Sequence, residues 1–493
     1  MTPVHDPSFE PFHSAVNRIP VLRTASSQDA QENKLPRELF SDEMAVGHDY
    51  LAPERLSGRI DLKLTVRTPL VCGEQTGGTS GRSVAIQPDA TGKPFVPPTM
   101  VKGMISRAYE ALTCSRFRVF DTHSKPLTYR DRRKRNSYNC SPHELAAYQE
   151  VLPLQSADEA SSADRLFGYV ISDSKGQHGG DVALRGSLSC GPVTFLLPDD
   201  IPFDPVSEQP YSLAPLLSAK PNSARRFLTS PEGKNPTDPA GQPLARGEYY
   251  SQGQLLGAAA FPTHRLLLGK TDFPISATQR VPTKGMSQDN DQVALTVNSW
   301  IKPGSILTCS LTFSNITKSE LGALLWILNP RNLVPESERD DGKAVGFLKM
   351  GLGKPLGLGA IEVQAVGLHV RTGKELAEGY ETLDACLSLG ELRPVDFSHY
   401  PLPFEENLLK TPWVRALQRS AFGYGDNIPV RYMTLSENKE NNQTDFKTGR
   451  PKPGRAQSPA SLAACDPQPL EVPRPPERNT GHKTWDRKPG RHW

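Results

Sequence analysis

Alternating apolar and polar residues predict two long strands in this chain. Residues 59–66 (RIDLKLTV) place Ile60, Leu62, Leu64 and Val66 at every second position, with polar residues between them. This period of two is typical of a strand with one buried face. The segment SILTCSLTFSNI, residues 305–316, alternates in the same way, and a third alternating segment follows a glycine-rich loop at 351–359.

Two other segments have the spacing of amphipathic helices. In VKGMISRAYEALT, residues 101–113, the apolar residues recur at helical intervals, and the prolines just ahead suit a helix entrance. The segment 319–328 (SELGALLWIL) predicts a second helix, which Asn329-Pro330 closes. Two strand–helix units separated by a long insertion predict an α+β fold with a ferredoxin-like or RNA-recognition-motif (βαββαβ) core. Sheets of this type offer a face for RNA.

The 493 residues are enough for two or three cores, or for one core with large insertions. The segment 200–290 is rich in Pro, Ser and Gly and is too long for a structureless loop, so we expect it to fold partly by itself or against a partner. At the N-terminus we expect a mostly irregular arm (1–56) in which Ile19, Val21 and Leu22 dock on the fold. The first half of the core (57–199) would contain a basic insertion at about 114–163, and the second half (291–433) would follow the 200–290 insertion. Residues 434–493 would be a disordered basic tail.

Positive charge is concentrated in one stretch, although the net charge of the chain is only +3. Residues 102–139 contain ten Lys or Arg and three acids, a local excess of seven. Aromatic residues lie among these cations, a mixture that suits single-stranded nucleic acid through phosphate neutralisation and base stacking. The alternative is a solvated basic loop packed by its own aromatic residues. The tail has the same two interpretations, contact with RNA or solubilisation alone. The candidate RNA-binding residues of the stretch are Arg116, Arg118, Arg132 and Arg133.

Compartment and metal binding are read from the apolar runs and the cysteines. No apolar run approaches the ~20 residues of a membrane span, and the N-terminus lacks a signal layout, so we expect a cytoplasmic protein with no membrane partner. The seven cysteines form no CxxC pair, which fits a reducing compartment.

Cys140 and His143, with Cys114 and His123 upstream, could form a structural zinc site, although Cys114 could equally be buried at a helix end.

The glycine-rich loop Gly351-x-Gly353-Lys354-Pro-Leu-Gly357-x-Gly359 matches neither a Walker loop nor a dinucleotide loop, because it leads into a strand rather than a helix. Glycine lets a backbone approach another chain closely and can present N–H groups to a phosphate, and Lys354 adds a charge. The alternative is a tight packing loop.

Several motifs in a fixed order resemble one family. VPPTMVKGMISRAYE, then RLFG at 165–168, and then GKPLGLG at 353–359 are similar to the RAMP superfamily of type III CRISPR-associated proteins, and the resemblance spans about residues 48–433. Finer matches include ARRF at 224–227, LLGAAAFPTH at 255–264 and VRYM at 430–433. The resemblance implies a crRNA-binding backbone subunit with a modified RNA-recognition-motif fold, acting in antiviral defence. Its implied partners are crRNA, complementary target RNA and other effector subunits.

The resemblance also implies roles for particular residues. Lys102 and Arg107 on the first helix would contact guide phosphates, and Gly103 would permit close approach. The glycine-rich loop, with Gly351, Gly353, Lys354, Gly357 and Gly359, would hold the guide backbone. Glycine loops and helix N-termini both offer amide donors to anions, which agrees with this assignment.

The same resemblance leaves catalysis open. RAMP subunits that cut target RNA place an Asp in the loop between the first strand and the first helix, where it assists a divalent metal. Here Arg82 or Ser83 falls at that place, while Asp89 lies later in the loop and Glu74 at its other end. The alternative function is therefore a metal-dependent endoribonuclease that uses Asp89 and Mg²⁺.

Three other interpretations concern the role of Asp89, guide maturation and a function outside defence. Asp89 could instead be an ordinary turn residue in PDATGKP. Guide maturation by a histidine in this loop is disfavoured because residues 68–99 contain no His. An RNA-binding protein unrelated to defence, the third class, would work alone.

Overall fold

The computed structural model describes residues 9–432 with internal gaps, together with Glu437 and Pro469. The gaps are 46, 77–81, 91, 119–126, 131–136, 141–150, 155, 172–181, 197–202, 206–210, 214–227, 230–239, 241–254, 270–294, 340–341 and 389–393. Within the described part, no helix is long and apolar enough to cross a membrane.

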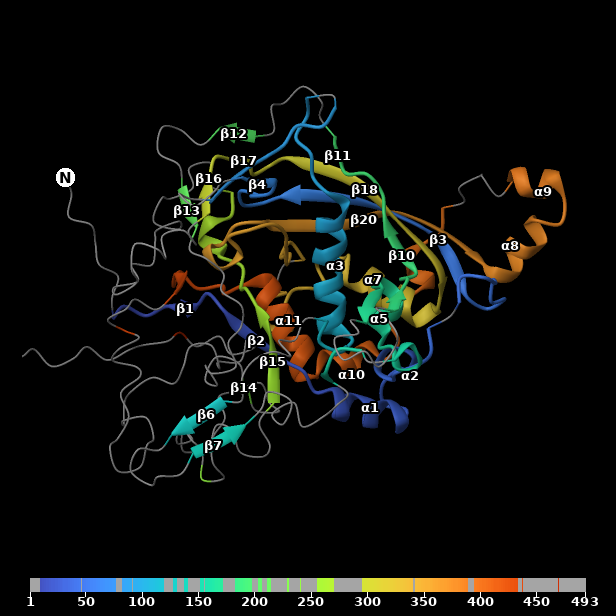
Figure 1. The fold of residues 1–493 in the computed structure, drawn as a ribbon, viewed down its shortest axis with the longest axis horizontal. Helices are drawn as coiled ribbons and strands as arrows, with labels where there is room; N and C mark the ends of the chain where they lie inside the picture. Colours follow the sequence, from blue (N-terminus) through green and yellow to red (C-terminus); the bar gives the residue numbers. More distant parts are fainter. Residues whose placement is uncertain are drawn as a thin grey trace, which may run out of the picture.

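A six-stranded sheet forms the centre of the molecule (Figure 1). Three long strands lie at its centre: β3 (Leu56–Val66) is antiparallel to β20 (Ala360–Thr372) on one side and to β18 (Ile306–Ile316) on the other. The order is β10-β18-β3-β20-β19, and β11 also pairs with β18. The outer strands are β10 (Leu188–Cys190), β11 (Thr194–Phe195) and β19 (Leu348–Lys349).

The alternation predicted for the long strands is confirmed. Ile60, Leu62, Leu64 and Val66 are at most 1% exposed, whereas the polar residues between them are half-buried. Strand β18 buries Leu307, Cys309, Leu311 and Phe313 in the same manner. The apolar sides of these strands therefore supply one layer of the core.

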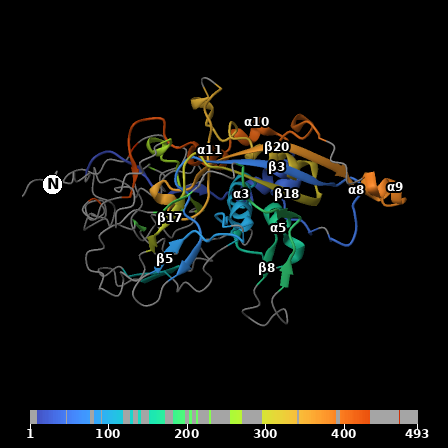
Figure 2. The ribbon, with the colours of Figure 1, turned by 90° about the horizontal axis from the view of Figure 1, so that it is seen from above.

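Helices supply the second layer of the core (Figures 1 and 2). The two predicted helices are confirmed as α3 (Pro98–Leu112), with proline in its first turn, and α7 (Lys318–Ile327), which begins with a Thr317–Glu320 capping box. Helices α3 and α7 follow β3 and β18 in the chain and bury their apolar residues in the same cluster as those strands. The α+β class is therefore confirmed. The other helices of this layer are α5 (Ser162–Phe167), α10 (Glu405–Leu409) and α11 (Pro412–Phe422).

The N-terminal arm differs from the expectation of irregular structure. It contains β1 (His13–Ser14), β2 (Asn17–Pro20), α1 (Arg23–Gln31) and α2 (Arg37–Phe40), and it buries Ile19 and Val21 as predicted, while Leu22 is half-buried. Helix α1 buries Arg23 and Ser26 beside Ala30. Because polar side chains occupy its buried face, α1 has no apolar periodicity in the sequence.

The described part of the 200–290 insertion pairs with the rest of the chain. Strand β15 (Leu255–Ala260) is antiparallel to β2, and α11 contacts β2. Strands β12 (Phe203–Pro205) and β13 (Tyr211–Leu213) pair with β17 (Ser299–Ile301) and β16 (Leu295–Val297). The remaining short strands are β4 (Glu74–Thr76), β5 (Arg82–Ala85), β6 (Leu127–Arg130), β7 (Ser137–Cys140), β8 (Tyr169–Ile171), β9 (Val182–Leu184), β14 (Leu228–Thr229) and β21 (Val430–Arg431).

Two short helices follow the long strand β20. Helices α8 (Gly373–Gly379) and α9 (Leu383–Ser388) project beyond the end of the sheet (Figure 1).

The predicted basic tail lies almost entirely outside the described residues. Its Glu437 is buried and pairs with Arg431 at 2.8 Å, so this position is anchored to the fold.

Candidate nucleic-acid interface

Helix α3 presents a narrow polar face that includes two predicted RNA-binding cations. Lys102 is half-buried and Arg107 is exposed, while Val101, Met104 and Ile105 on the opposite face are buried. Burial lowers the pKa of Lys102, and the nearby positive charge of Arg118 lowers it further. Lys102 has no carboxylate partner among the described residues, whereas Arg107 lies 3.1 Å from Glu110 in an ion pair that leaves the Arg107 side chain 60% exposed. The charge of Lys102 is therefore available to an anionic ligand.

The glycine-rich loop brings a third predicted cation to this helix. The loop contains a short 3-10 helix, Lys354–Leu356, and it directly follows β19, which contacts α3. Burial lowers the pKa of Lys354, and the charge of Arg107 lowers it further. An electrostatic effect of this kind requires proximity. The structure therefore brings Arg107 and Lys354 together, although they are far apart in the sequence.

The four loop glycines are explained by the packing of the loop itself. Gly351, Gly353, Gly357 and Gly359 all have positive φ, between 67° and 87°. A Cβ atom at Gly351 would overlap the carbonyl oxygen of Val71, and one at Gly359 would overlap the carbonyl oxygen of Met350. These glycines are required for the tight turn. The packing interpretation accounts for them, and Lys354 is the loop residue with an evident electrostatic role.

Gly103 differs from the loop glycines because nothing in the described structure requires it. It lies in α3, is exposed, and a Cβ atom built there would have no neighbour within 4 Å. Glycine in a helix interior is less stable than alanine by roughly 0.5–1 kcal/mol. Internal packing gives no reason for this loss. A ligand that approaches the helix backbone beside Lys102 does give one.

Gly103→Ala should therefore change stability and RNA binding in opposite directions. We expect the free energy of unfolding to rise by roughly 0.5–1 kcal/mol and the affinity for single-stranded RNA to fall, because the added methyl group occupies the approach to the helix. Urea unfolding and fluorescence anisotropy would measure the two effects.

Gly322→Ala in α7 is the matched control, because a Cβ atom there would overlap the carbonyl oxygen of Pro401. This variant should lose stability. Unchanged RNA affinity in a stabilised Gly103→Ala protein would contradict close approach at this position.

Two further basic groups at this site were not predicted from the sequence. The amine of Lys349 in β19 and Nε2 of His264 are buried and have no hydrogen-bond partner among the described residues. Burial lowers the pKa of Lys349 to about 7, with a further contribution from Lys354. Burial lowers the pKa of His264 to about 3, with a further contribution from Lys349. A single Lys and a single His in separate segments give no sequence signal, so only their proximity identifies them.

The predicted arginines after α3 have structural partners where they are described. Arg116 is buried, and its guanidinium donates to Asp42 at 2.7 Å and to the carbonyl of Leu152 at 3.2 Å. This placement is a correction to its assignment as an RNA contact, because its charge is already paired within the fold. Arg118 contacts Ser106 and the carbonyl of Gly168, and it lies near Lys102. Arg132 and Arg133 lie outside the described residues.

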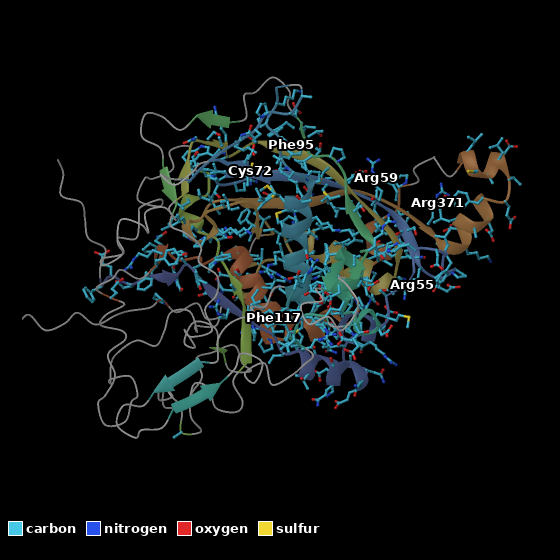
Figure 3. All side chains as sticks on the ribbon, in the orientation of Figure 1. Arg55, Arg59, Cys72, Phe95, Phe117 and Arg371 are labelled. Carbon is cyan, nitrogen blue, oxygen red and sulfur yellow. The ribbon has the colours of Figure 1, made fainter. Side chains whose placement is uncertain are left out.

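The aromatic residues of the basic stretch are only partly described. Phe117 packs against the core, which favours the packing interpretation at that position (Figure 3). Phe95, just before α3, is instead 46% exposed (Figure 3). An exposed ring next to cations can stack on a base. Phe95 was not among the sequence-predicted residues, since it lies outside the basic stretch.

Of the four predicted zinc ligands, only Cys114 has a described side chain. Cys114 is buried at the end of α3, as the alternative interpretation proposed, and burial raises the pKa of its thiol to about 11. His123, His143 and the side chain of Cys140 lie outside the described residues. The described part of the chain contains no group of three or more His, Cys, Asp or Glu residues that could hold a metal ion.

Asp89 has the contacts of a turn residue. Its carboxylate accepts a hydrogen bond from the Lys93 amide at 3.0 Å, and its carbonyl accepts one from the Gly92 amide at 3.0 Å. The carbonyl contact closes a β-turn over residues 89–92, and the carboxylate contact ties the following residue to that turn. Its side chain is exposed. Catalysis through Asp89 stays a prediction from the sequence.

Comparisons with known proteins yield only weak similarities. No family model matches the sequence, and no curated protein matches it. Among solved structures, the chain is similar to Csc2 of Thermofilum pendens, with 12% identity, a TM-score of 0.29 and coverage of 75% of this chain and 87% of that one. It is also similar to a chain of a type IV-B CRISPR complex, with 12% identity, a TM-score of 0.25 and coverage of 62% and 90%. TM-scores this low do not establish a shared fold.

Proposed function

We propose that this protein is a crRNA-binding subunit of an RNA-guided CRISPR effector complex of type III, and that it holds the guide by its sugar-phosphate chain. The observation that carries the proposal is that Arg107 on α3 and Lys354 of the glycine-rich loop are close enough for their charges to interact. Lys102, which has no carboxylate partner among the described residues, lies on the same helix. Phosphate contacts of this kind position a nucleic acid without reading its sequence. A subunit that carries many different guides needs that property.

The electrostatics of this surface support an anionic ligand. Lys102 and Lys354 both have lowered pKa values caused by burial and by a neighbouring arginine. Neither forms an ion pair with a described carboxylate. Like charges held together in this way repel each other until an anion is bound. Phosphate groups of an RNA strand would relieve that repulsion.

The strand order supports the RAMP-type core that the motifs imply. With β3, β10, β18 and β20 as the four core strands, the order β10-β18-β3-β20 places β18 between β3 and β10, and every neighbouring pair is antiparallel. This is the order of a split βαβ, or ferredoxin-like, unit. In this arrangement α3 lies on the connection from β3 to β10, which are separated in the sheet by β18. The helix with the cations is therefore part of the core motif.

Sequencing of the RNA that copurifies with the tagged protein from its own cells would test the proposal. We expect small RNAs that carry CRISPR-repeat sequence, together with other effector subunits. The same purification with Lys102, Arg107 and Lys354 all changed to Gln should lose the RNA. Recovery of the wild-type protein without RNA, or with RNAs lacking repeat sequence, would contradict the proposed function.

A further inference from the structure

Lys349 lies in β19, directly ahead of the glycine-rich loop, and its amine is in an unusual environment. The nitrogen is buried without a hydrogen-bond partner among the described residues, yet the side chain as a whole is only half-buried. Lysine side chains at a surface normally bury the stem and expose the ammonium group. In Lys349 the amine nitrogen instead points inward, so rotation about the bonds of the aliphatic side chain can return the amine to the surface.

The groups around Lys349 are basic. Lys349 is close enough to Lys354 of the loop and to His264 for their charges to interact, and Lys354 interacts in the same way with Arg107 of α3. The His264 ring, in the segment after β15, packs against Gly357 of the loop. His264 is kept neutral by burial, Arg107 is paired with Glu110, and Lys349 itself has no carboxylate partner among the described residues. A buried charged amine without a counter-ion is unfavourable. Burial without a counter-ion therefore shifts the amine of the free protein toward its uncharged form, which predominates above about pH 7.

We propose that Lys349 is an additional phosphate-binding residue that gains its proton when RNA binds. This inference rests on the proposed function. In the free protein the amine is buried, and a phosphate held at Lys354 and Arg107 supplies the missing counter-ion. The amine then turns toward the phosphate oxygen and takes up one proton from solvent to become ammonium. Well above pH 7, about one proton is bound for each RNA phosphate engaged at this position.

Proton uptake on binding fixes the sign of the pH dependence. The pKa of Lys349 is about 7 in the free protein, and the phosphate raises it toward the ordinary value for lysine of 10.5. Above about pH 7, binding must therefore protonate the amine, and the affinity falls as pH rises, by up to tenfold per pH unit. Below pH 7 the amine is already charged, and this contribution to the pH dependence disappears.

The test compares the wild type with Lys349→Met, which keeps the length of the side chain and removes the amine. The probe is a labelled single-stranded RNA of mixed sequence, and its affinity is measured from about pH 6.5 to 8.5 at constant ionic strength. We expect the wild-type affinity to fall more steeply than that of the variant above pH 7, by several-fold over this range. Lys354 and Lys102 also have lowered pKa values, so the difference between the two proteins isolates Lys349.

Thermal unfolding of the free protein distinguishes RNA binding from a structural role. Lys349→Met should raise the melting temperature, because it replaces an unpartnered buried amine with an apolar group. A residue needed for packing would lower it instead. Lys374→Met on α8, where Lys374 is exposed and lies 3.9 Å from Glu378, removes the same charge and is the control. It should leave the pH dependence of the affinity unchanged.

The outcomes separate this inference from the proposed function. If wild type and Lys349→Met show the same pH dependence while substitution of Lys102, Arg107 and Lys354 still lowers the affinity, the proton-coupled role is wrong and the proposed interface stands. If the wild type shows no affinity for RNA that depends on Lys102, Arg107 and Lys354, both are overturned.

Discussion

Changing Lys102, Arg107 and Lys354 together to Gln should lower the affinity for single-stranded RNA by about 100-fold at low salt. Lys102 and Arg107 lie on α3, and Lys354 of the glycine-rich loop lies near Arg107, so each would contact a phosphate. The dependence of log K on log salt should also become shallower by about 2, since roughly 0.7 counterions are released per phosphate neutralised on a single strand. Fluorescence anisotropy over a salt series measures both quantities.

A matched variant controls for the change in net charge. Arg331, Lys374 and Lys410 are exposed cations on other surfaces, and their joint change to Gln removes the same three charges. This control should lower the affinity only slightly. Equal losses in the two triple variants would show that RNA responds to overall charge rather than to the proposed interface. A loss confined to particular RNA sequences would contradict binding through the sugar-phosphate chain.

The second large effect is expected at the buried ion pair that joins α5 to α7. Arg165 and Glu320 are separated by 3.0 Å, and their side chains are only 6% and 3% exposed. Glu320 also completes the capping box of α7 by accepting from the Thr317 amide at 3.0 Å. Glu320→Gln keeps the shape but leaves the Arg165 guanidinium buried without its counter-charge. We expect the free energy of unfolding to fall by about 3–5 kcal/mol, measured by urea unfolding.

Two variants test that explanation. Glu362→Gln acts on the more exposed pair with Arg67 and should change the free energy of unfolding by less than about 1 kcal/mol. Arg165→Met combined with Glu320→Gln removes both buried charges and should recover part of the lost stability. If the double variant is as unstable as the sum of the two single variants, the loss comes from packing rather than from an uncompensated charge.

The elements found from the sequence are those whose burial follows a local period. Strands β3 and β18 and helices α3 and α7 have one apolar face each, so the spacing of their apolar residues predicts their type and their buried side. The assignment of Lys102, Gly103 and Arg107 to an RNA interface did not come from this pattern, because the motif resemblance implied it. Helix α1 escaped prediction because its buried face includes Arg23, whose counter-charge, Asp42, lies beyond the helix.

The sequence by itself determined the long strands and the two core helices, because local periodicity encodes which side of an element is buried. Only the tertiary structure decided which cations remain available to a ligand. It paired Arg116 with Asp42, placed Lys354 beside Arg107, and buried Lys349 without a partner among the described residues. Each of these outcomes depends on residues that are distant in the chain, and the effect of a charge depends on the groups that folding brings close to it.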